Sequence, residues 1–440
     1  MLVPTNWLLI LTGAVGVPAA ILVVLPDGAV IGYSLIAALI LAAAFDALMA
    51  RRRLQGIEVR TGPVVRLWKD RESGIELTIR NERQTPVALR IGLPLPEEIP
   101  APEEEMQITL PAASEFSRTT FACRPRVRGQ FFVTSCAVER SSALGLWKVR
   151  ALLSLPLEIR VYPNIAAERK QSPAFFRRGR LGVHGQRQLG KGKEFEKLRD
   201  YSPGDSFEDI DWKATARRGH PITRVFQIER TQEVYILLDA SRLTARPAAH
   251  DPSATILERN VTASLLFALA AEKQGDLFGL LTFSDRVHNF VRARNGKAHY
   301  ASCRDALYTL QPRMVAPDFD ELFTLLRLRL RRRALLVFLT ELDDPVVAER
   351  FVRNVRLIRQ HVVLVGMAQP SGARALFESP DVSGLDDVYQ KLAGHIQWSK
   401  LRELGQVLAR QGVRFSLLES ATLGPQLASL YIDLKQRQVI

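Results

Sequence analysis

Two long apolar runs near the amino terminus constrain this chain more than any other feature of its sequence. Trp7 to Leu25 contains no charged residue, and Ala29 to Met49 contains only Asp46. In a helix each run is long enough, at about 1.5 Å per residue, to cross a hydrocarbon core of about 30 Å. The polar turn between them, Pro26-Asp27-Gly28, is too short for a domain. The sequence therefore predicts a transmembrane helical hairpin in residues 1–53, with spans at about 7–25 and 29–49.

The charges that follow the hairpin predict its orientation. Arg51, Arg52 and Arg53 come directly after the second run, and the positive-inside rule places that end in the cytoplasm. A cleaved signal peptide is disfavoured because no basic region precedes the first run and a second run follows at once. We expect a two-span protein of the inner (cytoplasmic) membrane with its soluble domains in the cytoplasm. Asp46 lies close to the arginines, so its carboxylate is expected to reach the interface rather than to act inside the membrane.

The remainder of the chain is strongly basic. All 60 Lys and Arg residues lie in 51–440, with 44 of the 46 acidic residues, which gives this part a net charge of +16. A hydrophobic share of 47% excludes a mostly disordered chain. The basic stretch 164–193 has few aromatic residues for stacking, so a nucleic-acid partner is disfavoured and a linker near an anionic membrane surface is favoured.

The three cysteines, Cys123, Cys136 and Cys303, do not form a C-x-x-C pair. This usage argues against a disulfide framework and against a zinc site. Cys123 and Cys136 could face each other across a hairpin, but two separate buried thiols are the favoured interpretation.

Two further regions differ in their hydrophobic pattern. Residues 54–163 contain short alternating runs punctuated by Pro and Gly, which predicts an all-β sandwich. Residues 231–440 alternate apolar strands with amphipathic helices, which predicts an α/β domain with a parallel sheet of the Rossmann type. The expected strands are 234–238, 277–283, 334–339, 362–367 and 413–418, and the expected helices are 258–273, 319–332, 346–360, 399–411 and 423–435. The segment 164–230 between these two regions is read as a basic linker followed by a charged motif.

Polar residues follow three of the predicted α/β strands. Because ligands of such sheets bind beyond the carboxyl ends of the strands, these residues are candidates for a site. They are Asp239, Ser241, Ser284, Asp285, Thr340 and Glu341.

A dense charged and aromatic motif links the two regions. It comprises Glu194-Phe195, Leu198-Arg199, Tyr201, Pro203-Gly204-Asp205, Ile210-Asp211-Trp212-Lys213, Ala216-Arg217, Arg224 and Glu229. This motif resembles the defining motif of the Domain of Unknown Function 58 family. The chain departs from the family pattern at Glu208, usually Arg, and at Ser142 to Leu146, where an acidic turn is common.

The resemblance implies a plan for nearly the whole chain: paired membrane helices, a β-rich region, the motif, and a von Willebrand factor A-like domain. It also implies a MoxR-type AAA+ ATPase as partner, in the assembly or maturation of protein complexes. The adhesion site of A-like domains binds Mg²⁺ through an Asp-x-Ser-x-Ser run, a Thr and an Asp. Here Asp239 and Ser241 match, Leu243 replaces the last Ser, and Glu341 stands for the Asp. We therefore expect a degenerate site and no cofactor beyond weak Mg²⁺ binding.

The motif itself reads as a strand, a turn and a short helix. Trp212 and Ala216 are four residues apart on one helix face, which predicts that Trp212 is part of a core. No nucleophile, metal triad or cofactor loop accompanies the carboxylates, so we expect no catalytic residues and an interaction motif. Its candidate residues are Glu194, Arg199, Tyr201, Gly204, Asp205, Asp211, Trp212, Lys213 and Arg217.

Three functions compete. The first is a membrane-anchored cytoplasmic adaptor that binds the ATPase. The second is a hydrolytic enzyme that uses Asp205 or Asp211 as a general base. The third is a basic membrane-surface scaffold without an ATPase partner. The sequence favours the adaptor, with Arg199 as the first candidate for a dominant binding residue.

Overall fold

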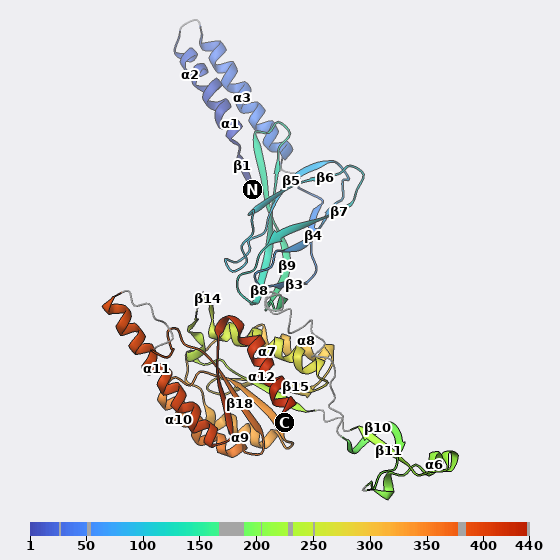
Figure 1. The fold of residues 1–440 in the computed structure, drawn as a ribbon. Helices are drawn as coiled ribbons and strands as arrows, with labels where there is room; N and C mark the ends of the chain where they lie inside the picture. The colour runs from blue at the N-terminus through green and yellow to red at the C-terminus, as the bar shows by residue number, and fades with distance from the viewer. Residues whose placement is uncertain are drawn as a thin grey trace. The chain divides into compact units, whose positions relative to one another are not determined.

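The computed structural model describes residues 1–25, 28–50, 54–166, 189–203, 205–227, 232–249, 251–376 and 384–437. For 189–197 and 225–227 it describes the backbone alone. The chain divides into two compact units, Met1–Asn164 and Ile165–Ile440, and Figure 1 shows their elements.

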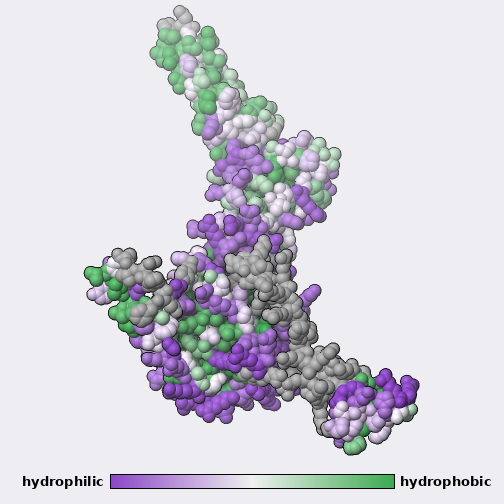
Figure 2. All heavy atoms as spheres, in the orientation of Figure 1, coloured by the Kyte–Doolittle hydropathy of each residue, from purple (hydrophilic) through white to green (hydrophobic). Residues whose placement is uncertain are grey.

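The first unit begins with two apolar helical segments. α1 (Asn6–Leu11), a π-helical turn (Thr12–Gly16) and α2 (Val17–Val24) form one segment, and α3 (Ala29–Ala50) forms the other. Both are long and apolar enough to cross a membrane. Figure 2 shows their surface as largely hydrophobic, and large side chains such as Leu9, Ile21 and Leu41 are exposed. An apolar surface of this extent is stable in lipid rather than in water, so the helices indicate a membrane protein. Arg51, Arg52 and Arg53, on which the predicted orientation depends, lie outside the described residues.

Two sheets fill the remainder of the first unit. In the larger sheet the order is β1 (Leu2–Pro4), β9 (Trp147–Tyr162), β8 (Gly129–Ser141), β5 (Val87–Gly92) and β6 (Glu105–Leu110), and β3 (Val64–Trp68) also pairs with β9. The smaller sheet contains β2 (Ile57–Arg60), β4 (Ser73–Asn81) and β7 (Phe116–Cys123). Buried and exposed residues alternate along β4 and β5, so both sheets contribute apolar side chains to one shared core.

Cys123 and Cys136 lie in different sheets, on β7 and β8, and both are buried free thiols, as is Cys303. Burial raises the pKa of Cys123 and of Cys136 to about 11. These thiols therefore stay protonated and inert at neutral pH.

A six-stranded sheet organises the second unit. Its order is β16 (Val287–Arg294), β15 (Leu277–Phe283), β12 (Glu233–Asp239), β17 (Ala334–Leu339), β18 (Val362–Ala368) and β19 (Val413–Leu418). The five strands β15, β12, β17, β18 and β19 run parallel to one another. The edge strand β16 is antiparallel to β15. A small ladder of β13 (Pro247–Ala248) and β14 (Asp251–Thr255) precedes the first helix.

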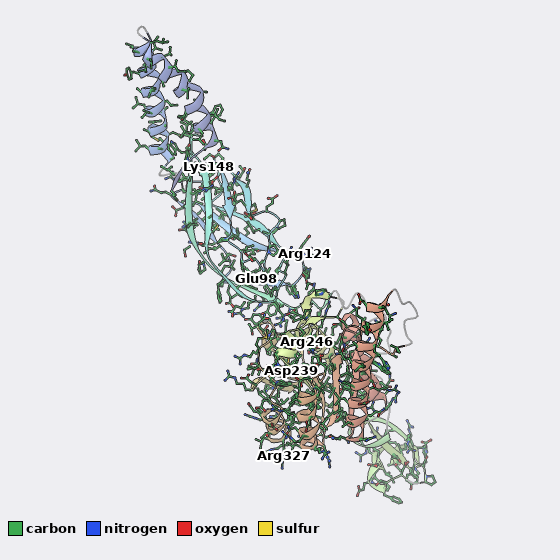
Figure 3. All side chains as sticks on the ribbon, turned by 90° about the vertical axis from the view of Figure 1, so that its left-hand side faces the viewer. Glu98, Arg124, Lys148, Asp239, Arg246 and Arg327 are labelled. Carbon is green, nitrogen blue, oxygen red and sulfur yellow. The ribbon has the colours of Figure 1, made fainter. Side chains whose placement is uncertain are left out.

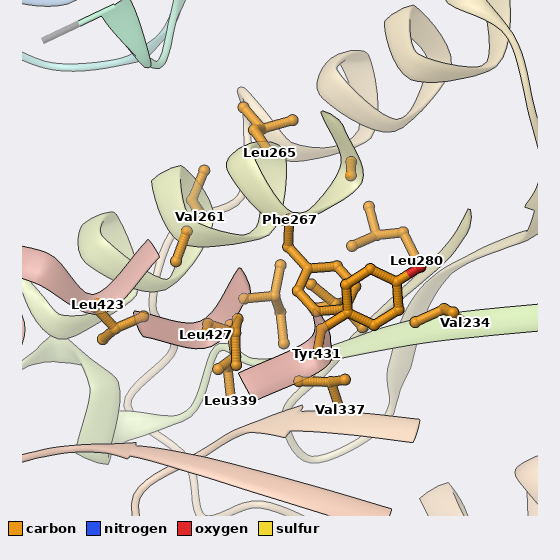
Figure 4. Close-up of a cluster of buried hydrophobic side chains, with 14 of the residues drawn as sticks. Val234, Val261, Leu265, Phe267, Leu280, Val337, Leu339, Leu423, Leu427 and Tyr431 are labelled. Atoms are coloured by element: carbon orange, nitrogen blue, oxygen red, sulfur yellow. The ribbon is translucent and has the colours of Figure 1, made fainter. Parts of the chain in front are cut away.

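Helices cover both faces of this sheet because successive strand side chains point to opposite faces. On β12, Val234, Ile236 and Leu238 pack with α7 (Ile256–Lys273), α8 (Lys297–Leu307) and α12 (Leu423–Gln436). Figure 4 shows Phe267 of α7 and Tyr431 of α12 in this cluster. Tyr235 and Leu237 point the other way and pack with α9 (Phe319–Arg329), α10 (Pro345–Asn354) and α11 (Leu385–Arg410). Strands buried on both faces explain the continuous apolar runs in the sequence.

The charged motif forms a small module of its own. β10 (Leu189–Asp200) and β11 (Ile222–Gln227) pair antiparallel, and α6 (Trp212–Arg218) lies between them in the chain. Asp211 caps α6 by accepting a hydrogen bond from the Ala214 N–H, and Gly219 ends the helix with a φ of 74°.

Candidate functional site

Asp239 is the first candidate residue at the carboxyl edge of the parallel strands. It ends β12 and is fully buried. Its Oδ1 accepts from the Ser241 N–H at 2.8 Å, and its Oδ2 accepts from the Thr340 hydroxyl at 2.6 Å. Burial raises the pKa of Asp239, although the hydrogen bond from Thr340 opposes this. The structure therefore brings together Asp239, Ser241 and Thr340 from two adjacent strand ends.

Glu341 lies at the same edge, beside a cation that sequence reasoning missed. Its side chain is buried, and the Arg246 Nη2 is 3.6 Å from its Oε2. Burial raises the pKa of Glu341 to about 8, although the nearby Arg246 acts in the opposite direction. The guanidinium also forms a bidentate pair with Asp343, at 2.5 and 3.0 Å, and its Nε donates to the Leu243 carbonyl. Figure 3 shows Asp239 and Arg246 in this part of the unit.

These residues do not fit a resident Mg²⁺ ion. Mg²⁺ requires a near-octahedral shell of oxygen ligands. Leu243 offers no oxygen, and its side chain packs against the hydrophobic cluster beneath it. Arg246 adds a fixed positive charge next to Glu341, which would repel a divalent cation.

The nearby acids Asp318 and Asp320 are engaged elsewhere. Asp318 caps α9, and Asp320 accepts a hydrogen bond from Asn354 and pairs with Arg353.

A serine and a histidine meet at the neighbouring strand end. The Ser284 hydroxyl is 2.7 Å from Asp285 Oδ1 and 2.7 Å from His288 Nε2. Such a pair can activate a nucleophile, and burial lowers the pKa of His288, which keeps the imidazole neutral. However, Ser284 is fully buried and cannot reach a substrate in this arrangement.

Arg199 and Asp205 of the motif pair with each other. Arg199 Nη2 donates to Asp205 Oδ1 at 2.6 Å, and Asp205 Oδ2 accepts from the Ser202 N–H at 3.0 Å. The backbone hydrogen bond from Ser202, together with Arg199, lowers the pKa of Asp205. Asp205 therefore remains an ionised acceptor that holds the turn after β10.

Trp212 was predicted to be part of a core, and that prediction is wrong. Its side chain is 66% exposed at the first position of α6. The helix contacts β11 through another face, where the Thr215 hydroxyl accepts a hydrogen bond from the Ile222 N–H. Trp212 and Ala216 do share a face, but it is the face that is open to the surroundings.

The other motif candidates lie around this helix. Tyr201 packs against Phe207 with ring centroids 6.1 Å apart, and the Phe207 side chain is 73% exposed. Lys213 and Arg217 are exposed on α6. The Glu194 side chain and Gly204 lie outside the described residues.

Sequence reasoning missed three functional candidates. Arg246 carries no motif signal, because its acidic partners are about a hundred residues away in the chain. Phe207 and Arg218 were not singled out. Exposed aromatic side chains and unpaired cations can be recognised only once the exposure of each side chain in the folded protein is known.

Part of the chain matches a family model. Residues 197–374 match the family model described as "Protein of unknown function DUF58". An uncharacterized protein of Mycobacterium tuberculosis, Rv1480, is 27% identical over 200 residues, which cover 44% of this chain and 59% of that protein. The uncharacterized protein YeaD of Bacillus subtilis is 28% identical over 151 residues, covering 33% of this chain and 37% of YeaD. The chain thus spans less than two thirds of the length of these relatives.

Solved structures with some likeness include the conserved hypothetical protein BatB from Bacteroides thetaiotaomicron. It is 13% identical, with a TM-score of 0.31, and the match covers 47% of this chain and 99% of that one. An aerotolerance-related membrane protein from Bacteroides fragilis is also 13% identical, with a TM-score of 0.30 and coverage of 46% and 98%. Likenesses of this size say nothing about function. The resemblance drawn from the motif is confirmed by this match of residues 197–374 to the DUF58 family model.

Proposed function

We propose that this protein is a membrane-anchored adaptor of the inner membrane, with its soluble units in the cytoplasm. Its partner is a MoxR-type AAA+ ATPase, and the complex acts in the assembly or maturation of other proteins. The two apolar helices support the anchor. The partner class follows from the family resemblance, and the motif module is the proposed binding surface.

The exposed Trp212 is the observation that carries this proposal. Binding energy at interfaces concentrates in a few residues, among which Trp and Arg are enriched. The same short segment of chain also exposes Phe207, Lys213, Arg217 and Arg218, and within the described residues these three cations have no ion pair. Exposed aromatic side chains and unpaired cations on one short segment favour an acidic partner surface.

We also propose finer assignments for the two units. The shared core of the two sheets supports a β-sandwich in the first unit. The parallel strands with helices on both faces support a von Willebrand factor A-like, Rossmann-type domain in the second. In that domain the Arg246 guanidinium, rather than a metal ion, provides the positive charge beside Glu341 and Asp343.

An enzymatic function of the motif is the weaker alternative. Asp205 is bonded to Arg199 and Ser202, and Asp211 is the cap of α6. Both carboxylates therefore serve the fold of the module. Loss of a measured hydrolytic activity in Asp205→Asn or Asp211→Asn, with the fold intact, would favour the enzyme.

The test is recovery of an AAA+ ATPase from native membranes with the tagged full-length protein. Trp212→Ala should lose most of the recovered ATPase while its melting temperature changes little, because the ring is exposed. Phe132→Ala is the matched control, since its ring is 65% exposed on β8 of the other unit. Absence of an ATPase with the wild type, or equal recovery with Trp212→Ala, would contradict the proposal.

Arg199→Ala serves a different purpose in the same experiment. The Arg199–Asp205 bond holds the turn, so this variant should destabilise the module as well as weaken binding. Loss of ATPase recovery together with a lower melting temperature in Arg199→Ala would indicate a structural contribution. Loss of recovery without a change in melting temperature, as expected for Trp212→Ala, indicates a direct contact.

A further inference from the structure

The loop between β8 and β9 contacts both ends of the apolar hairpin. Asp46 is buried four residues before the end of α3, and three groups of this loop donate hydrogen bonds to its carboxylate. They are the Ser142 hydroxyl at 2.5 Å, the Leu144 N–H at 3.0 Å and the Leu146 N–H at 3.2 Å. The Trp147 indole N–H also donates to the Ala43 carbonyl of α3 at 2.9 Å.

The first apolar segment is tied to the same loop. Thr5, the residue that caps α1, donates its N–H to the Leu146 carbonyl at 3.0 Å and its hydroxyl to the Gly145 carbonyl at 2.8 Å. Just before it, β1 pairs with the start of β9, with Val3 opposite Lys148. The loop is therefore hydrogen-bonded both to the beginning of the first apolar segment and to the end of the second.

This arrangement sets the depth of the loop if the helices span a bilayer. α3 has 22 residues, which at about 1.5 Å each exceeds a hydrocarbon core of about 30 Å only slightly. Asp46 then lies about 6 Å inside the end of the span, and the loop that donates to it reaches the same level. A carboxylate at that depth is costly unless it is hydrogen-bonded, and the three donors meet this need.

The exposed part of the loop has the chemistry of a lipid contact. Ala143 is exposed and the Leu144 side chain is 54% exposed. Charged groups begin directly after the loop: Lys148 and Arg150 both pair with Glu139. Figure 3 shows Lys148 where the helices meet the sheets of this unit. Apolar side chains thus precede charged ones by a few residues, as at a boundary between acyl chains and headgroups.

We propose that residues 142–146 are embedded in the membrane interface and that Leu144 inserts among the lipid acyl chains. The β-rich unit is thereby held against the bilayer, and Asp46 is the residue that positions the loop. The partner is the phospholipid surface itself. This inference depends on the membrane anchor of the proposed function.

The experiment measures depth in the full-length protein reconstituted in lipid nanodiscs. Leu144→Cys, Leu41→Cys and Gln130→Cys are each labelled with a small fluorophore and exposed to lipids that carry a quencher on the acyl chain. The native cysteines are buried, and labelled wild type measures their background. Leu41 is exposed on α3 and reports the span. Gln130 pairs with Arg160, about 40 Å along β9 from Trp147 at 3.3 Å per residue.

The fluorophore should lose most of its emission in Leu144→Cys and Leu41→Cys. It should keep its emission in Gln130→Cys. Quenching at Leu41 without quenching at Leu144 would overturn the loop insertion and leave the anchor intact. No quenching at Leu41 would overturn the anchor, and the loop insertion with it. In an Asp46→Leu background, quenching at Leu144 should fall while that at Leu41 persists. Unchanged quenching at Leu144 would show that Asp46 does not position the loop.

Discussion

Glu341 links the chemistry of one side chain to the stability of the second unit. Its pKa is raised from 4.5 to about 8 by burial, so the native state binds more protons than the unfolded state between these two values. The free energy of unfolding should therefore fall as the pH rises from 4.5 to 8, by at most about 1.4 kcal/mol per pH unit. In Glu341→Gln the slope between pH 5 and 8 should be smaller than in the wild type, because the amide stays neutral.

The measurement is a series of melting curves of the full-length protein between pH 5 and 9. Glu349→Gln, which changes an exposed residue on α10, is the control and should keep the wild-type slope. A slope in Glu341→Gln as steep as that of the wild type would contradict the assignment of this titration to Glu341.

Arg246 and Leu243 lead to a prediction about metal ions. A ligand that binds the native state raises the melting temperature according to its concentration relative to Kd. Because Leu243 removes an oxygen and Arg246 repels a dication, millimolar Mg²⁺ or Mn²⁺ should leave the melting temperature of the wild type almost unchanged. A clear increase that Asp239→Ala abolishes would show that the strand-end site binds the ion after all.

The helix α6 depends on a single cap. Asp211 accepts from the Ala214 N–H at 2.9 Å, and Arg217 and Arg218 lie in the last turn, where positive charge favours the helix. Asp211→Ala should destabilise this helix by about 1 kcal/mol. Amide hydrogen exchange in residues 214–218 should then be about fivefold faster. Glu208→Ala, outside the helix and exposed, should leave these amides unchanged; equal acceleration in both variants would rule out the cap.

The orientation of the whole protein in the membrane can be tested with reporter fusions. Three arginines after the second apolar run predict that both ends of the hairpin lie in the cytoplasm. An enzymatic reporter fused after Ile440 should be active only in the cytoplasm, and one inserted at Asp27 only on the other side. Activity of the Ile440 fusion outside the cytoplasm would exclude a cytoplasmic ATPase as partner.

Elements with a strong local pattern were predictable from the sequence. The strands β15, β17 and β19 begin and end where the apolar runs predicted them, because a strand buried on both faces is apolar throughout. β16 was missed, since this edge strand is only half-buried and carries charges. α11 begins at Leu385, well before the predicted residue 399, because its first turns are exposed and show no core-facing stripe.

Contacts between distant residues were decided by the tertiary structure alone. The two apolar runs and the charged motif could be read from neighbouring residues, since periodicity and composition are local properties of a chain. The hydrogen bonds of Asp46 to residues 142–146 and of Arg246 to Asp343 join segments about a hundred residues apart. Likewise, the exposure of Trp212 depends on which face of α6 meets β11. Such pairings follow from how the strands and helices pack, and packing is a property of the assembled fold.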